Sequence, residues 1–157
     1  MKWLLIITFI FVIMIIALSV SEQYKDKYNF YVNLKLFLEK FKLNLAFKQE
    51  KLDNFLNSIK SKKQFRLFID EYKRYLETNE LDLSKIQILE QDEIAELKEI
   101  ITSVGRLDQK GELEQTECFL KRIEPKLSKA NEDMTKLCPM IIKLSLLFAV
   151  GLAILLI

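Results

Sequence analysis

The residues with the most chemical potential are glutamates that recur at every third position of one segment: Glu90, Glu93, Glu96 and Glu99. Paired carboxylates support acid–base catalysis or bind metal ions when they converge from different elements into one pocket. A step of three places these carboxylates along a single helix, where they do not converge. The pattern therefore does not indicate catalysis. Two interpretations remain: a solvated helix face, or an acidic face on which a partner protein docks.

Other reactive residue types are scarce. The chain has no histidine, which removes the commonest general base and a frequent metal ligand. Its two cysteines, Cys118 and Cys138, would lie about 30 Å apart on a straight helix at roughly 1.5 Å per residue, too far for a disulfide. We therefore expect no enzyme activity, no metal and no cofactor. We expect both cysteines to be reduced and to serve in packing.

The charged residues gather in the middle of the chain. Without Lys2 and Lys143, the 24 basic residues become 22, which equals the 22 acidic residues, so the middle region is formally neutral. Nucleic acid is therefore not the expected partner, because phosphate binding needs a basic surface. Residues 22–75 carry 13 basic and 7 acidic side chains, and residues 76–120 carry 4 and 12. The two segments either attract each other within one bundle or present faces of opposite sign to partners.

The N-terminal segment is strongly apolar. Residues 3–18 contain one polar side chain, Thr8, and a run of this length is near the lower limit for crossing a bilayer. The alternative is a secretory signal peptide, with Lys2 as its basic start and a cleavage site near Ala17-Leu18-Ser19. The length of the run and its bulky β-branched residues favour an uncleaved anchor. We therefore predict a transmembrane helix over residues 1–20.

A helical bundle domain is predicted for residues 21–138. Apolar residues at steps of three and four indicate a long helix from about Glu22 to Phe47, then short helices and turns, with Ser84 as the N-cap of a later helix. No alternation typical of β-strands stands out, so the fold class is all-α. The first helix carries a second set of apolar residues beside its main stripe, and this set must be covered by its own bundle or by another subunit. The second set is Leu36, Phe37, Leu43 and Phe47.

The last third of the chain carries an apolar seam that continues into the C-terminal tail. Its heptad spacing predicts one long helix, bent at Pro125 and Pro139 with the register of the seam kept. Residues 139–157 form a short hydrophobic segment, which crosses a bilayer if Lys143 extends to the interface. A buried hairpin or an oligomerisation helix is the alternative. The seam residues are Leu113, Thr116, Leu120, Ile123, Leu127, Ala130, Met134, Leu137, Ile141, Leu144, Phe148, Gly151 and Leu155.

Lysines near the tail predict the orientation. Lys126, Lys129, Lys136 and Lys143 precede the tail, and no charged side chain follows it. Basic residues favour the cytoplasmic side, so we expect the helical domain in the cytoplasm and both termini outside. Lys2 weakly opposes this orientation.

The order of these parts resembles the stage III sporulation protein AB family of endospore-forming bacteria. That family has an N-terminal anchor, a helical domain similar to the cytoplasmic domains of type II secretion platform proteins, and a short apolar C-terminal helix. Its turn reads Leu-Gly-x-x-Asp with a glutamine shortly after. Here Gly105 and Asp108 match the turn, and Glu112 stands in place of the glutamine. The family's Lys-Leu-Gly before the tail is Lys143-Leu144-Ser145 in this chain.

The resemblance implies a structural subunit of the membrane complex that joins mother cell and forespore. The helical domain would lie on the mother-cell side, with other subunits of the complex, a cytoplasmic secretion-type ATPase among them, as partners. A homo-oligomer is also compatible with the wide apolar helix. The competing hypothesis is an exported or surface-anchored helical interaction protein, which requires a cleaved N-terminus.

Overall fold

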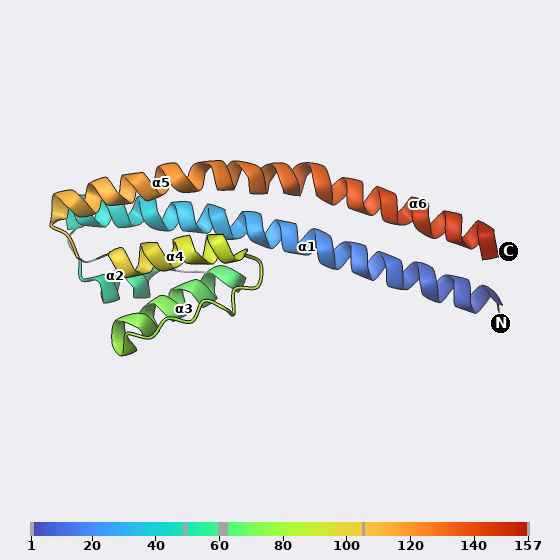
Figure 1. Ribbon diagram of the computed structural model, residues 1–157, viewed down its shortest axis with the longest axis horizontal. Coiled ribbons are helices and arrows are strands. Elements are labelled where there is room, and N and C mark those ends of the chain that lie inside the picture. The colour runs from blue at the N-terminus through green and yellow to red at the C-terminus, as the bar shows by residue number, and fades with distance from the viewer. Residues whose placement is uncertain (1, 49, 60–62, 105, 157) are drawn as a thin grey trace. The chain divides into compact units, whose positions relative to one another are not determined.

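The computed structural model describes residues 2–48, 50–59, 63–104 and 106–156, and every regular element within them is helical (Figure 1). This confirms the all-α prediction. Two of the elements, η1 and η2, are short π-helices. The elements are α1 (Lys2–Leu43), η1 (Asn44–Lys48), α2 (Leu52–Ser58), α3 (Lys63–Thr78), α4 (Gln91–Ser103), α5 (Gln109–Glu132), η2 (Asp133–Leu137) and α6 (Cys138–Leu156).

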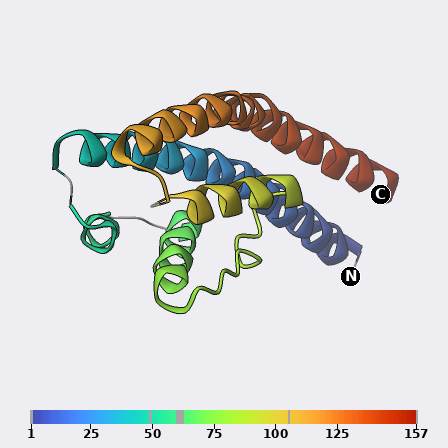
Figure 2. The same cartoon turned by 60° about the vertical axis from the view of Figure 1, so that its left-hand side comes forward.

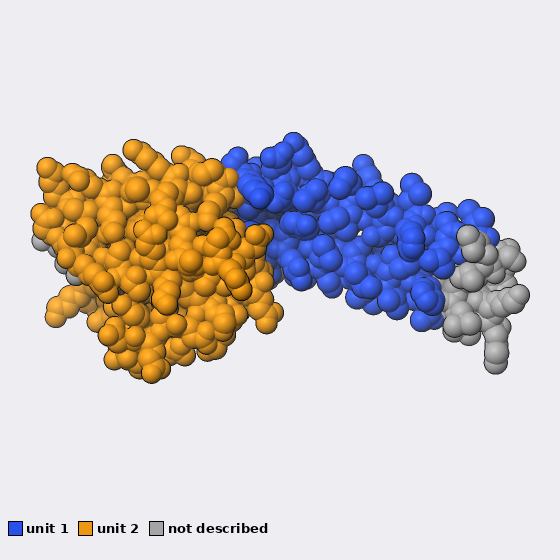
Figure 3. Space-filling model, viewed as in Figure 1, with its two compact units in different colours: residues 1–28, 128–157 blue, residues 29–127 orange. Residues whose placement is uncertain are grey.

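The chain forms two compact units (Figure 3). Unit 1 contains Met1–Tyr28 and Ser128–Ile157, and unit 2 contains Asn29–Leu127. Unit 1 therefore includes several helical turns beyond the apolar segments predicted as residues 1–20 and 139–157. Those extra turns, residues 21–28 and 128–138, contain most of the charged residues next to the two apolar segments.

Unit 1 is an antiparallel helical hairpin. The N-terminal end of α1 and the C-terminal end of α6 lie side by side in both ribbon views (Figures 1 and 2). Several residues buried in unit 1 are small, as in helix pairs within membranes. The Cys138 thiol also donates a hydrogen bond to the backbone carbonyl of Ser21, at 3.4 Å. The small buried residues are Ala17, Ser21, Ala130, Cys138 and Ala149.

The buried face of α6 lies one residue later than the seam predicts. Leu144 and Phe148, both predicted seam residues, are 58% and 63% exposed, whereas Ala149 is 1% exposed. A π-helix has one more residue per hydrogen-bonded turn than an α-helix, so η2 rotates everything after it by one position. The prediction that the register survives to the C-terminus is therefore wrong.

The two prolines act differently. Pro139 is the second residue of α6 and lies two positions after Leu137, the last residue of η2. Its missing N–H and bulky ring disrupt a regular helical turn before it, which fits a wide π-turn at this place. Pro125 lies inside α5, which continues to Glu132. The helix is therefore continuous through Pro125, where the sequence predicted a bend.

Unit 2 has an aromatic core between α1, α2 and α3. Neighbouring rings have centroids 5.3–6.4 Å apart, mostly edge-on or tilted, and such pairs add stability beyond burial itself. The spacing of the α3 aromatics follows one helical face. The core rings belong to Phe30, Tyr31, Phe37, Phe41, Phe55, Phe65, Phe68 and Tyr72, all at most 5% exposed.

The fourth helix begins later than predicted. Ser84 donates its backbone N–H and hydroxyl hydrogens to Oδ1 of Asp82, at 3.1 and 2.6 Å, so it stabilises a local turn and does not cap a helix. Helix α4 begins at Gln91, and Glu90 and Glu93 form a reciprocal capping box at its start. That arrangement satisfies backbone donors which the first helical turn leaves open.

Candidate functional site

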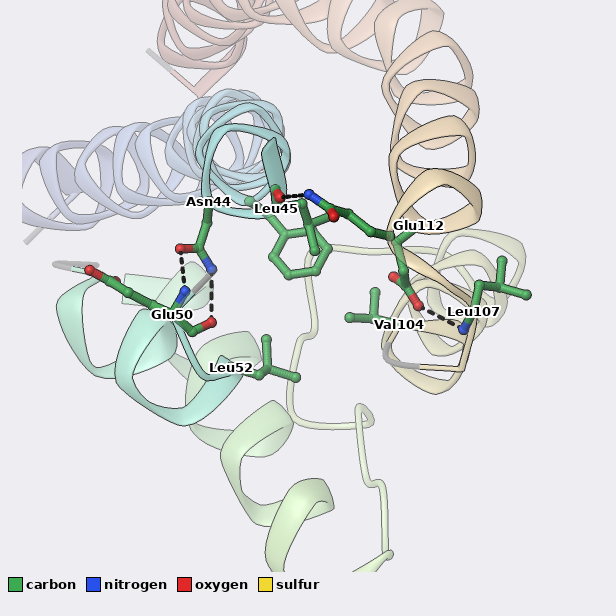
Figure 4. A pocket seen from close by; sticks show the side chains of 9 residues that line it. Asn44, Leu45, Glu50, Leu52, Val104, Leu107 and Glu112 are labelled. Carbon is green, nitrogen blue, oxygen red and sulfur yellow. Dashed lines mark hydrogen bonds between the residues drawn. The ribbon is translucent and has the colours of Figure 1, made fainter. Parts of the chain in front are cut away.

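A pocket of about 260 Å³ lies in unit 2, where the end of α1, the start of α2 and the α4–α5 connection meet (Figure 4). Ligand and cofactor pockets usually measure about 300–1,000 Å³, so this pocket suits a protein side chain better than a cofactor. Its walls are mainly apolar, and one buried carboxylate faces it. The lining residues are Phe41, Asn44, Leu45, Glu50, Leu52, Val104, Leu107, Gln109 and Glu112.

Two amide side chains hold the backbone around this pocket. The Asn44 side chain, in η1, both donates to the carbonyl and accepts from the N–H of Glu50, each at 3.2 Å. Gln109, at the start of α5, donates to the Leu45 carbonyl at 2.6 Å. The end of α1 is thereby joined to the next segment of chain and to α5, so the pocket walls are held by hydrogen bonds.

The α4–α5 connection is organised around Asp108 and Glu112. Asp108 accepts the Gly111 N–H at 3.0 Å and so caps α5. Oε1 of Glu112, a residue only 4% exposed, accepts the N–H groups of Arg106 and Leu107 at 3.0 and 3.1 Å. A glutamine oxygen could accept the same two hydrogen bonds. The hydrogen bonds of Glu112 are therefore ones that a glutamine at this position could also make.

Gly111 is required by the close approach of this turn to α5. A Cβ at this position would lie 2.8 Å from Oδ1 of Asp108 and 3.1 Å from Cβ of Leu107. Either the cap or the Leu107 side chain would have to move. Gly105, the glycine of the family-like turn, lies outside the residues that the structure describes.

The glutamate series of α4 makes contacts within the bundle. Glu93 accepts the Tyr31 hydroxyl hydrogen of α1 at 2.7 Å and the Glu90 N–H at 2.8 Å. Glu96, with a side chain 12% exposed, pairs with Arg122 and Lys126 of α5. A partner that docks on these carboxylates would compete with these bonds, and the docking role of Glu90, Glu93, Glu96 and Glu99 stays a prediction.

Arg122 links two of these glutamates. Its guanidinium donates to both oxygens of Glu99, at 2.9 and 2.8 Å, and its Nε lies 3.0 Å from Glu96. Hydrogen bonding from Arg122 lowers the pKa of Glu99 below its ordinary value. Two ion pairs also join α1 to α5, Lys35–Glu124 at 3.3 Å and Lys42–Glu117 at 2.5 Å. Some of the basic residues of the first helix and the acidic residues of the later helices therefore pair with each other inside the bundle.

The remaining predicted residues are not among those that line the pocket. Lys143 is exposed on α6, and its interfacial role stays a prediction. Cys118 is exposed and Cys138 is buried, and both are free thiols. The described residues contain no cluster of three or more histidine, cysteine or acidic side chains that could hold a metal ion.

Sequence reasoning missed Asn44, Gln109 and Arg122. Asn44 had a usable signal, because a buried polar residue within an apolar stripe needs a hydrogen-bond partner. Gln109 and Arg122 had none, since their partners are distant in sequence and only the packing of the helices brings them close.

One comparison with known proteins identifies a relationship. A family model described as stage III sporulation protein AB matches residues 2–157. No curated protein and no solved structure matches the chain.

Proposed function

Because the chain belongs to the stage III sporulation protein AB family, we propose that it is a non-enzymatic structural subunit of a sporulation-type membrane secretion or channel complex. In this role the apolar helices anchor it in the cell membrane. They hold the helical domain at the cytoplasmic, mother-cell face, where other subunits, including a secretion-type ATPase, dock.

The exposed apolar surface of unit 1 carries this proposal. Two helices are long and apolar enough to cross a membrane. In each of them, the most apolar stretch is only 11% buried. A core helix of a water-soluble protein would bury most of that surface, so lipid is the natural cover. Helix α6 has 19 residues, about 28 Å at 1.5 Å each, close to the roughly 30 Å hydrocarbon core of a bilayer. Large side chains more than half exposed include Ile7, Phe9, Phe11, Ile15, Ile16, Leu18, Leu144, Leu146, Leu147, Phe148, Val150 and Ile154.

The hairpin of unit 1 supports the proposed topology. Two antiparallel spans leave both outer ends on one side of the membrane and residues 29–127 on the other. Lysines concentrate beside the inner ends of the spans, whereas Lys2 alone lies beyond an outer end. This bias favours a cytoplasmic helical domain.

Thiol labelling tests this orientation with a native residue. In a Cys138→Ser chain, exposed Cys118 is the only cysteine. We expect a membrane-impermeant maleimide to leave it unlabelled in intact protoplasts and to label it after permeabilisation. As a control, a Cys118→Ser, Cys138→Ser chain with one cysteine added after Ile157 should be labelled from outside. Labelling of Cys118 in intact protoplasts would overturn the orientation.

The packing of unit 1 favours an uncleaved N-terminus over the exported alternative. Cleavage near Ser19 would divide α1 beside Ala17 and Ser21, which are 2% exposed and pack within the hairpin. Helix α6 would lose the partner that covers its small-residue face. Intact-mass measurement of the membrane-purified protein tests this point: a chain that starts near Val20 would refute the anchored scaffold.

A further inference from the structure

One side of α1 in unit 2 is left uncovered by the described part of the chain. Leu36 is 48% exposed, Leu43 is 57% exposed, and Phe47, which follows on η1, is 81% exposed. Their spacing of seven and four residues places them on one helical face. Phe37, the fourth member of the second apolar set, is 2% exposed. The bundle therefore buries Phe37 alone among the four residues of the second apolar set.

The other sides of α1 are already occupied. Phe30, Phe37 and Phe41 contact the aromatic rings of α2 and α3. Lys35 and Lys42 pair with glutamates of α5. The uncovered side is thus a distinct third face and not an extension of the core.

Two exposed charged residues, Glu39 and Lys40, lie beside Leu36 and Leu43 at opposite edges of this face. Lys40 is exposed. It lies four residues after Leu36 and three residues before Leu43. Its neighbours at three and four positions are Leu36, Phe37, Leu43 and Asn44, none of them acidic. Across the described residues, no hydrogen bond or ion pair involves Lys40. Its charge is therefore available to a partner.

A pocket adjoins the face between α1 and α2. It measures about 270 Å³ and can accept one large side chain of a partner, the usual form of an energetic anchor in an interface. Glu50 also lines it, so a partner carboxylate would have to lie on the Lys40 side. The lining residues are Lys40, Leu43, Asn44, Glu50, Phe55 and Ser58.

A second copy of this chain is a poor occupant. Two copies anchored in one membrane by the same N-terminal segment run their α1 helices in the same direction. Parallel pairing of identical faces would set Lys40 against Lys40 between two layers of leucine, where like charges repel. This step rests on the membrane anchoring proposed above. A helix of another protein with a carboxylate at the matching position satisfies both the apolar residues and the charge.

We propose that the α1 docking face, defined as Leu36, Lys40, Leu43 and Phe47, binds an amphipathic helix of a different protein. That helix carries apolar residues at steps of three and four and a carboxylate opposite Lys40. The leucines and Phe47 supply the apolar contact, and Lys40 selects the partner by charge.

A charge-swap experiment with synthetic helices tests the proposal. The probes are two stapled helical peptides with leucines at heptad positions and either glutamate or lysine at the centre. Binding to the full chain in detergent solution is measured by fluorescence anisotropy. We expect the glutamate peptide to bind about fivefold more tightly than the lysine peptide. Lys40→Glu should reverse this preference, and Phe47→Ser should weaken both peptides without unfolding the chain, because Phe47 is 81% exposed.

Lys98→Glu is the matched control, because Lys98 is also an exposed lysine but lies on α4. It should leave the preference for the glutamate peptide unchanged. Failure of both peptides to bind, or a preference that Lys40→Glu does not alter, would overturn the proposal. So would dimers of the wild-type chain in size-exclusion chromatography with light scattering that Phe47→Ser dissociates. These measurements do not depend on topology, so their failure is distinguishable from a failure of the proposed orientation.

Discussion

Replacement of Glu112 separates its role as a hydrogen-bond acceptor from its negative charge. Glu112 is 4% exposed, and one of its oxygens accepts the N–H groups of Arg106 and Leu107. Glu112→Ala leaves both donors without this acceptor. Loss of hydrogen bonds to a charged group costs about 1.5–3 kcal/mol each, and water can partly replace them at this exposed connection. We therefore expect Glu112→Ala to lower the free energy of unfolding by about 2 kcal/mol. Glu112→Gln keeps an acceptor oxygen and should cost less than half as much.

Thermal unfolding of the detergent-solubilised chain, followed by circular dichroism, measures the effect. A loss of about 2 kcal/mol corresponds to roughly 8–16 °C in the midpoint for a unit of about 100 residues. Hydrogen exchange of the peptide that contains Arg106 and Leu107 adds a local readout, and its protection should fall in Glu112→Ala only. Glu114→Ala is the control, because Glu114 is exposed on the same helix. Equal midpoints for the alanine and glutamine variants would refute the assigned role of Glu112 as an acceptor.

Two further predictions concern α5. Ile123 is 1% exposed, so Ile123→Ala should lower the free energy of unfolding by about 2–5 kcal/mol and Ile123→Val by about 0.5–1.5 kcal/mol. Chemical denaturation measures both changes. Effects as small as that of Lys121→Ala, at an exposed residue of the same helix, would show that the seam is not part of the core. Arg122→Gln removes the hydrogen bonds that lower the pKa of Glu99, whose ordinary value is 4.5. A carboxyl group with a lowered folded-state pKa stabilises the fold above its ordinary pKa, and this stability is lost as the pH falls through the lowered value. The midpoint of Arg122→Gln should therefore lie below the wild-type midpoint at neutral pH and approach it in acid, and a gap that widens in acid would contradict the pairing.

The local pattern of the sequence determined most of the helices. Apolar spacing in α1, α2, α3 and α5 marks one face of each helix, and burial of such a face drives the helix to pack. Asp108 was identifiable as a cap because a cap bonds to backbone only three residues away. The two apolar segments could be predicted from composition alone, because segments in contact with lipid must consist mainly of apolar side chains.

Contacts between segments distant in sequence needed the tertiary structure. The start of α4 was misplaced because a capping box at Glu90 and Glu93 competed with the weaker signal of Ser84. The pairing of the α4 glutamates with Arg122 depends on how α4 and α5 pack, which no spacing along one helix reports. The pocket beside Glu112 also requires three separate segments to meet.

The sequence by itself determined that this chain is helical, that its two ends are apolar, and that one side of its first helix carries more apolar surface than a single seam needs. Only the tertiary structure decided which of those apolar residues the bundle covers. It also decided the register of the last helix. The first outcome depends on packing, because α2 and α3 cover Phe37 and leave Leu36 and Leu43 open. The second depends on the path of the backbone, because one extra residue in η2 turns Ala149 inward in place of Phe148.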